Sequence, residues 1–94
     1  MNLKRKYFKQ ADKLVQTYPK LNFRNHCYWR IALDNTLQDK WDTVVQRPAY
    51  ANLSAAQLRQ VVELLEAYEK NEPLLKEHNK NSLIFRRLKS KRSM

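Results

Sequence analysis

Apolar side chains recur at three- and four-residue spacing in four segments of the chain, a period typical of helices that bury one face. The first segment runs from about residue 3 to residue 18, and Pro19 ends it because the residue before a proline avoids the α region. We expect its apolar stripe to face the core. The stripe consists of Leu3, Tyr7, Ala11, Leu14, Val15 and Tyr18.

The second segment, residues 25–46, is the most apolar of the four, so we expect it to form the central helix of the core. Asn25 is suited to its N-cap. Asp34 and Asn35 could mark a kink or a break, because both side chains compete for backbone hydrogen bonds, and the sequence leaves open whether the helix breaks there. Asp34 is also placed to form an i, i+4 pair with Arg30. The stripe consists of Trp29, Leu33, Leu37, Trp41, Val44 and Val45, widened by Tyr28, Ile31 and Ala32.

The third segment, residues 54–71, has the clearest beginning. Ser54 and Gln57 fit a capping box, in which the side chains of the N-cap and of the residue three positions later each accept a backbone hydrogen bond from the other. Leu53 and Leu58 take the flanking positions at which two apolar side chains pack across the start of a helix. The predicted buried stripe consists of Leu58, Val61, Val62, Leu65 and Tyr68.

The fourth segment begins at Pro73, which is suited to the first turn of a helix. We expect a helix over residues 73–89, followed by a flexible tail at residues 90–94. The run from Asn79 to Ser82 is a weak point, at which Ser82 could cap a separate short helix. The residues expected to share a face are Leu74, Leu75, His78, Ser82, Phe85 and Leu88.

Together these segments predict an all-α protein, a small three- to four-helix bundle that occupies residues 1–94 as a single helical domain with basic, partly frayed termini. The chain contains no glycine. This disfavours tight β-hairpins and excludes the glycine-rich phosphate loops of the Walker and Rossmann types. No stretch of the sequence approaches the roughly 18 consecutive apolar residues that a membrane-spanning helix needs.

The net charge of +10 is concentrated at the two ends of the chain. Residues 1–24 carry seven basic side chains against one acidic side chain, and residues 73–94 carry the same excess. Residues 25–47 are neutral, and residues 48–72 have a net charge of −2. This distribution favours a polyanionic partner. Nucleic acid, either RNA or DNA, is the leading candidate, because each neutralised phosphate releases counterions and strengthens binding.

We therefore expect a nucleic-acid-binding module, or a subunit of a nucleoprotein assembly, whose basic ends contact phosphates with little dependence on sequence. Phe8 lies just off the apolar stripe and could stack on an unpaired base. Trp29 and Trp41 could do the same or anchor a partner protein, although their spacing also suits the core. The expected phosphate-binding residues are Lys4, Arg5, Lys6, Lys9, Lys13, Lys20, Arg24, Arg86, Arg87, Lys89, Lys91 and Arg92.

Other functions remain open. The basic ends could be solubilising arms, or the protein could be a small adaptor or inhibitor that docks on an acidic or nucleic-acid-binding surface of a larger protein. The first segment could lie on a membrane surface, but a stripe rich in tyrosine and alanine is poorly suited to that role. A homodimer could form if an acidic stripe pairs with a basic end of a second copy; the stripe consists of Glu63, Glu66, Glu69 and Glu72.

Catalytic and metal-binding constellations are not expected. His26 and Cys27 are adjacent, so a helix would point their side chains about 100° apart rather than toward each other. One cysteine and two distant histidines do not supply the ligand set of a zinc site. We expect no enzyme activity and no cofactor. Because Cys27 is the only cysteine, no internal disulfide can form, which suits a cytoplasmic protein.

Overall fold

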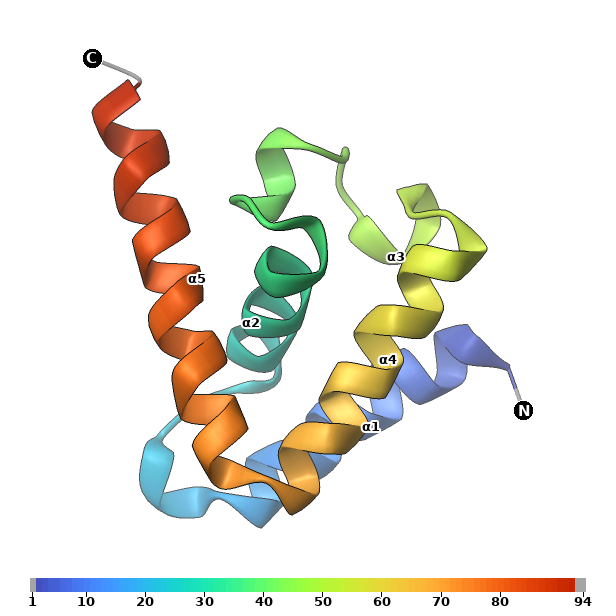
Figure 1. The fold of residues 1–94 in the computed structure, drawn as a ribbon. Coiled ribbons are helices and arrows are strands. Elements are labelled where there is room, and N and C mark those ends of the chain that lie inside the picture. Colours follow the sequence, from blue (N-terminus) through green and yellow to red (C-terminus); the bar gives the residue numbers. More distant parts are fainter. Residues whose placement is uncertain (1, 93–94) are drawn as a thin grey trace.

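The computed structural model describes residues 2–92, with the backbone alone for residues 89–92. This part of the chain contains helices and no strand, which confirms the all-α prediction (Figure 1). The 3₁₀ turns Pro19–Leu21 and Trp41–Thr43 lie between the helices. The α-helices are α1 (Leu3–Thr17), α2 (Asn25–Leu37), α3 (Ala49–Asn52), α4 (Ala55–Lys70) and α5 (Glu72–Arg92).

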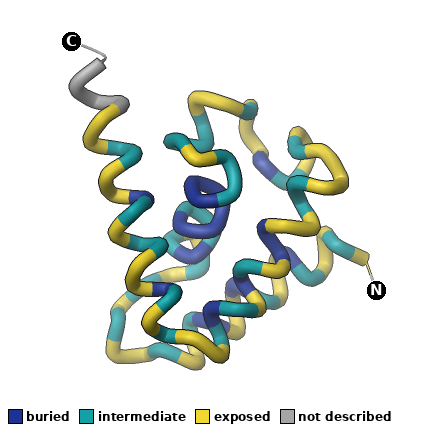
Figure 2. Tube along the Cα trace, in the orientation of Figure 1, coloured by how far each residue is buried: buried dark blue, intermediate teal, exposed yellow. Residues whose placement is uncertain are grey.

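Helix α2 is the centre of the molecule, as its apolar sequence predicts. It packs against α1 on one side, α4 on another and α5 on a third. Tyr28, Ile31 and Leu33 are almost completely shielded from solvent, and the buried residues of α2 form a continuous block in Figure 2. A helix that is buried nearly all round needs apolar side chains on more than one face, which explains the broad stripe of this segment.

The stripes predicted for α1 and α4 are confirmed where the two helices pack on each other. Tyr7, Ala11 and Leu14 are buried on α1, and Val61 and Leu65 are buried on α4. Each helix places these residues on one side because three- and four-residue spacing returns to the same face. The polar and charged residues between them face solvent, which leaves α1 with a long basic outer face.

The capping box predicted at the start of α4 is also confirmed. The Ser54 hydroxyl accepts a hydrogen bond from the backbone N–H of Gln57 at 3.1 Å, and Gln57 Oε1 accepts one from the backbone N–H of Ser54 at 2.9 Å. Leu53 and Leu58 both pack against the core, as expected of the residues that flank the cap. The local sequence therefore determines where α4 begins.

Helix α2 ends at Leu37, so the prediction of a helix to residue 46 is wrong. Gln38 adopts the left-handed conformation, with φ of 57°, and its backbone N–H bonds to the carbonyl of Asp34. The side chain of Asp34 does not break the helix, because Oδ1 accepts a hydrogen bond from the backbone N–H of Trp41 at 3.0 Å instead. The chain then continues through a 3₁₀ turn toward α3, and Trp41 folds back onto the core.

Helix α5 is continuous, so the predicted weak point at residues 79–82 is wrong. The Ser82 hydroxyl donates to Asp34 Oδ2 at 2.6 Å and accepts from Arg30 Nη1 at 2.7 Å. Asn79 Oδ1 accepts from Arg30 Nη2 at 2.8 Å. Because α2 engages these polar side chains, they no longer compete for the backbone of α5.

The end of α5 also differs from the prediction. The helix runs to Arg92, so residues 90–92 are helical rather than a tail, and residues 93–94 lie outside the described part of the chain. Leu88 was expected to share a face with Leu75 and Ser82, which are buried, but its side chain is 50 % exposed. It lies near the end of α5 that projects beyond the other helices in Figure 1.

Candidate nucleic-acid interface

The outer face of α1 presents a row of exposed cations. Asn2 caps the helix by accepting a hydrogen bond from the backbone N–H of Lys4 at 2.8 Å. Lys4, Arg5 and Lys9 are exposed, and Lys6 is half-buried. Arg5 and Lys9 point away from the buried stripe of α1, whereas Lys4 lies at the edge of the stripe. Among the described residues, no acidic side chain forms an ion pair with Lys4, Arg5 or Lys9. These three side chains are therefore available to a ligand.

Lys13 differs from the other cations of α1. Its Nζ lies 3.0 Å from Glu69 Oε2, and Gln10 Nε2 donates to Glu69 Oε1 at 2.8 Å. Hydrogen bonds from Gln10 and Lys13 lower the pKa of the Glu69 carboxyl. Part of the acidic stripe of α4 is thus engaged within the chain, whereas Glu63 and Glu66 remain exposed.

Aromatic rings meet where α1 crosses α2. The rings of Tyr7 and Trp29 are parallel within 2°, with centroids 5.1 Å apart. Phe8 is perpendicular to Trp29, with centroids 5.5 Å apart, and it contacts Tyr50 edge-on at 5.0 Å. Trp29 Nε1 donates a hydrogen bond to the carbonyl oxygen of Tyr7 at 3.0 Å. This bond and the ring contacts hold the indole in one orientation, while Phe8 stays 36 % exposed.

A groove opens beside these rings between α1, α2 and residues 41–50, and we call it the aromatic groove. Its volume is about 290 Å³, close to the lower limit of about 300 Å³ for small-molecule sites. None of the described residues that line it is acidic. Its lining includes Phe8, His26, Trp29, Trp41, Arg47 and Tyr50.

Two cations lie against aromatic rings of the groove. Lys4 Nζ is 4.9 Å from the centroid of the Tyr50 ring, and the guanidinium carbon of Arg47 is 5.1 Å from that of Trp41. Arg47 Nη2 also lies 2.8 Å from Asp42 Oδ2. Burial raises the pKa of Asp42, but the hydrogen bond from Arg47 and nearby cations outweigh that effect and lower it. The groove therefore combines aromatic walls with a positive edge.

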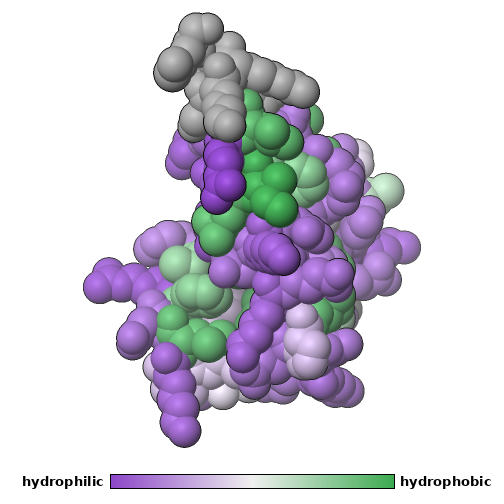
Figure 3. Space-filling view, turned by 60° about the vertical axis from the view of Figure 1, so that its left-hand side comes forward, coloured by the Kyte–Doolittle hydropathy of each residue, from purple (hydrophilic) through white to green (hydrophobic). Residues whose placement is uncertain are grey.

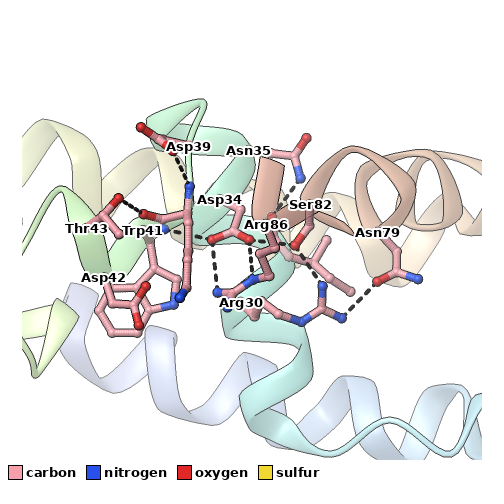
Figure 4. Close-up of polar contacts among 12 residues, drawn as sticks. Arg30, Asp34, Asn35, Asp39, Trp41, Asp42, Thr43, Asn79, Ser82 and Arg86 are labelled. Carbon is pink, nitrogen blue, oxygen red and sulfur yellow. Dashed lines mark hydrogen bonds and ion pairs between the residues drawn. The ribbon is translucent and has the colours of Figure 1, made fainter. Parts of the chain in front are cut away.

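Arg86 was expected to contact phosphate, but the structure uses its guanidinium within the protein. Its Nε lies 2.8 Å from Oδ2 of Asp34, whose side chain has no solvent exposure (Figure 4). No hydrogen bond joins Arg30 to Asp34, so the predicted i, i+4 pair is replaced by bonds from Arg30 to Ser82 and Asn79. Burial, followed by the positive charge of Arg86, lowers the pKa of Arg30.

The remaining basic residues lie in other places. Arg87 is exposed on α5, and the side chains of Lys89, Lys91 and Arg92 lie outside the described part. Helix α1 packs on α4 and α2, whereas α5 packs chiefly on α2, and the two chain ends lie at opposite sides of Figure 1. The basic ends therefore form two separate regions. Two further exposed bases, Lys20 and Arg24, lie in the connection from α1 to α2.

The residues considered for chemistry are also separated. His26 is exposed at the aromatic groove, and Cys27 is half-buried. His78 Nδ1 lies 2.7 Å from the Tyr68 hydroxyl, and burial lowers the pKa of this histidine. Within residues 2–92, no cluster of three potential metal ligands occurs. No helix in that range has the length and apolar character to cross a membrane.

The sequence prediction identified Phe8, Trp29 and Trp41 as site residues but missed other residues of the groove, among them His26, Arg47 and Tyr50. These come from segments that the fold brings together, and no spacing rule connects them. The sequence did contain one signal. Trp41 is followed by Arg47 and Tyr50, a basic and an aromatic residue, and Pro48 between them keeps this stretch out of the preceding helix.

The chain was compared with protein-family models, with curated proteins and with solved structures, and none of these comparisons gives a match.

Proposed function

We propose that the protein binds nucleic acid and that the exposed cations of α1 contact its phosphates. The observation that supports this most is the row formed by Lys4, Arg5 and Lys9, because these side chains are exposed and have no acidic partner among the described residues. Such contacts strengthen binding by counterion release. They do not distinguish one sequence from another.

The basic end of α5 supplies a second contact region in this proposal. Arg87 is exposed there, and residues 80–92 contain no acidic residue. Arg86 is left out of the proposed interface because Asp34 engages its guanidinium. We place this activity in the cytoplasm, because a chain with the single cysteine Cys27 cannot form the internal disulfides that an oxidising compartment favours.

A titration with labelled RNA and DNA oligonucleotides tests the proposal. We expect binding at about 50 mM salt that weakens steeply as salt is raised. Replacing Lys4, Arg5 and Lys9 by glutamine should weaken binding to a single strand. It should also reduce the slope of log K against log salt by about 2, because each lost contact removes about 0.7.

A control variant with the same change in charge shows whether position matters. Arg59, Lys70 and Lys76 are exposed on α4 and at the beginning of α5, away from the groove, and their replacement by glutamine should change the slope little. An equal loss in both variants would mean that only net charge matters. Absence of binding to any nucleic acid at about 50 mM salt would refute the proposal.

The second candidate function is docking on a larger protein, and the apolar face of α5 favours it. Leu83, Ile84 and Leu88 are 51 %, 41 % and 50 % exposed, and Figure 3 shows apolar surface along this end of α5. Lys80 and Arg87 are exposed on the same helix. A helix with such a face fits an apolar groove that has an acidic rim.

A pull-down after nuclease treatment distinguishes this function from the first. A partner that is retained without nucleic acid, and is lost when Leu83 and Leu88 are replaced by serine, would support docking through α5. If a variant without the cations of α1 still retains the partner protein, then docking and nucleic-acid binding use different surfaces. A partner that is released by nuclease would point back to nucleic acid.

A further inference from the structure

We infer that the aromatic groove binds one unpaired base of a single-stranded nucleic acid, an inference that rests on the proposed nucleic-acid binding. It identifies the form of nucleic acid that the protein takes. In a duplex, bases are paired and stacked, whereas a single strand can turn a base out onto an aromatic side chain.

The rings of the groove are already held in place. Trp29 is fixed by its hydrogen bond to the Tyr7 carbonyl and by the parallel contact with the Tyr7 ring. Phe8 is held edge-on to Trp29 and to Tyr50, yet remains 36 % exposed. A ligand that stacks here has no side chain to immobilise, so more of the stacking energy contributes to affinity.

The charges of the groove select an anionic partner for those rings. Lys4 and Arg47 each lie within about 5 Å of an aromatic centroid. Arg47 is paired with Asp42, whereas Lys4 has no acidic partner among the described residues, and no acidic residue is among the described lining residues. Inorganic phosphate would leave the aromatic walls unused, and a neutral apolar ligand would leave Lys4 unused. A base together with its phosphate uses both.

Continuity with α1 favours a strand over a free nucleotide. Phe8 belongs both to the aromatic groove and to a shallow depression on the outer face of α1, whose lining contains the three cations Lys4, Arg5 and Lys9 and one acidic residue, Asp12. A backbone that follows these cations passes Phe8 at the mouth of the groove. The groove volume of about 290 Å³ admits one planar ring system and leaves the rest of the strand outside.

The test uses the full chain and an oligothymidylate of about ten nucleotides, within the range of known single-strand sites. Stacking in the groove should quench the fluorescence of Trp29 and Trp41. Replacing the central bases with abasic residues, which keeps every phosphate, should weaken binding and reduce the quenching. A duplex of equal length should bind more weakly than the single strand and quench less.

The variant Phe8→Leu removes the exposed ring but keeps an apolar side chain, so we expect binding of the oligothymidylate to weaken about 5- to 20-fold. Its salt slope should match the unmodified protein, since no phosphate contact is lost. Leu83→Ala, at an exposed apolar position on α5, is the control and should bind normally. Urea unfolding of both variants checks that the fold is retained.

The outcomes separate this inference from the proposed function. If Phe8→Leu and the abasic strand bind as tightly as their references, while the glutamine variant of the α1 cations binds weakly, the groove inference is wrong and nucleic-acid binding stands. Equal or tighter binding of the duplex also overturns the inference. If thymidine monophosphate binds as tightly as the strand, the ligand is a free nucleotide and the assignment to a strand is wrong. If no nucleic acid binds at all, the proposed function fails and the inference fails with it.

Discussion

Asp34 connects three parts of the molecule through one carboxylate. It lies on α2, accepts hydrogen bonds from Ser82 and Arg86 of α5, and accepts another from the backbone of Trp41. Its side chain has no solvent exposure. A buried carboxylate is tolerated only when its charge and its lone pairs are compensated, and here the guanidinium of Arg86 supplies the opposite charge.

We expect Asp34→Asn to lower the free energy of unfolding by about 3 kcal/mol. The substitution leaves the guanidinium groups of Arg30 and Arg86 close together without the carboxylate. Urea denaturation followed by circular dichroism measures the change. Glu63→Gln removes an exposed carboxylate of α4 and should cost less than about 0.5 kcal/mol. Equal stability of the two variants would show that the Asp34 pair is not a main support of α5.

His78 makes the stability of the protein depend on pH below neutrality. Burial, only partly offset by the charge of Glu77, lowers the pKa of His78 below its ordinary value of 6.5. The unfolded chain therefore binds the proton more readily than the folded protein. The stabilising effect is complete above about pH 6.5 and is lost as pH falls through the folded pKa of His78.

We therefore expect the free energy of unfolding to fall between about pH 7 and pH 5.5, by less than about 1.4 kcal/mol per pH unit. His78→Gln should be less stable than the unmodified protein at pH 7, since the bond to the Tyr68 hydroxyl changes, but it should depend less on pH. His26→Gln, at an exposed position, should keep the original dependence. A pH dependence that persists in His78→Gln and disappears in His26→Gln would contradict this assignment.

At the scale of the element, α4 shows how a short signal determines where a helix begins. Ser54→Ala removes the hydroxyl that accepts the backbone N–H of Gln57, and we expect a loss of about 1 kcal/mol in the free energy of unfolding. Gln60→Ala, at an exposed position inside the same helix, should not destabilise the protein because alanine favours helices. Thermal unfolding of the two variants makes the comparison, and equal melting temperatures would show that the capping box contributes little.

The elements that could be predicted are those determined by local sequence. The stripes of α1 and α4 and the capping box at Ser54 need no information from the rest of the fold. The end of α2 could not be predicted, because Gln38 takes the left-handed conformation usually given to glycine or asparagine, and the apolar spacing continues to Trp41 regardless. The continuity of α5 depends on a contact between Asp34 and Ser82, which are 48 residues apart.

The candidate site divides in the same way. The cations of α1 and the aromatic ring of Phe8 could be predicted because they share one helix. The aromatic groove could not, because its walls also come from α2 and from the segment that contains Arg47 and Tyr50. For Arg86 the prediction from residue type failed. Arginine is suited to phosphate, but the guanidinium of Arg86 is engaged by Asp34, a partner that only the fold reveals.

At the scale of the whole molecule, the separation of the two basic ends limits how the proposed nucleic acid would bind. The molecule measures 40 × 30 × 17 Å, and α1 and α5 reach opposite sides of it (Figure 1). Glu63 and Glu66 are exposed on α4, which packs on α1, so phosphates are repelled from that face. A strand that contacts both basic ends therefore needs to cross a large part of the molecule.

Oligonucleotide length should consequently change the salt dependence. A stacked strand advances about 3.4 Å per phosphate, and an extended single strand about twice as far, so between about 6 and about 12 nucleotides span the 40 Å of the long axis. A strand of about 4 nucleotides, which is too short to reach α5 even when extended and contacts only the three cations of α1, should give a slope of log K against log salt near −2. For a strand of about 18 nucleotides that also reaches residues 87–92, which carry four basic residues, the slope should approach −4 to −5.

Replacing Arg87 and Lys91 by glutamine should flatten the slope of the long strand only, because the short strand never reaches α5. If both lengths give the same slope in the unmodified protein, the basic end of α5 is a solubilising arm and α1 alone contacts the nucleic acid.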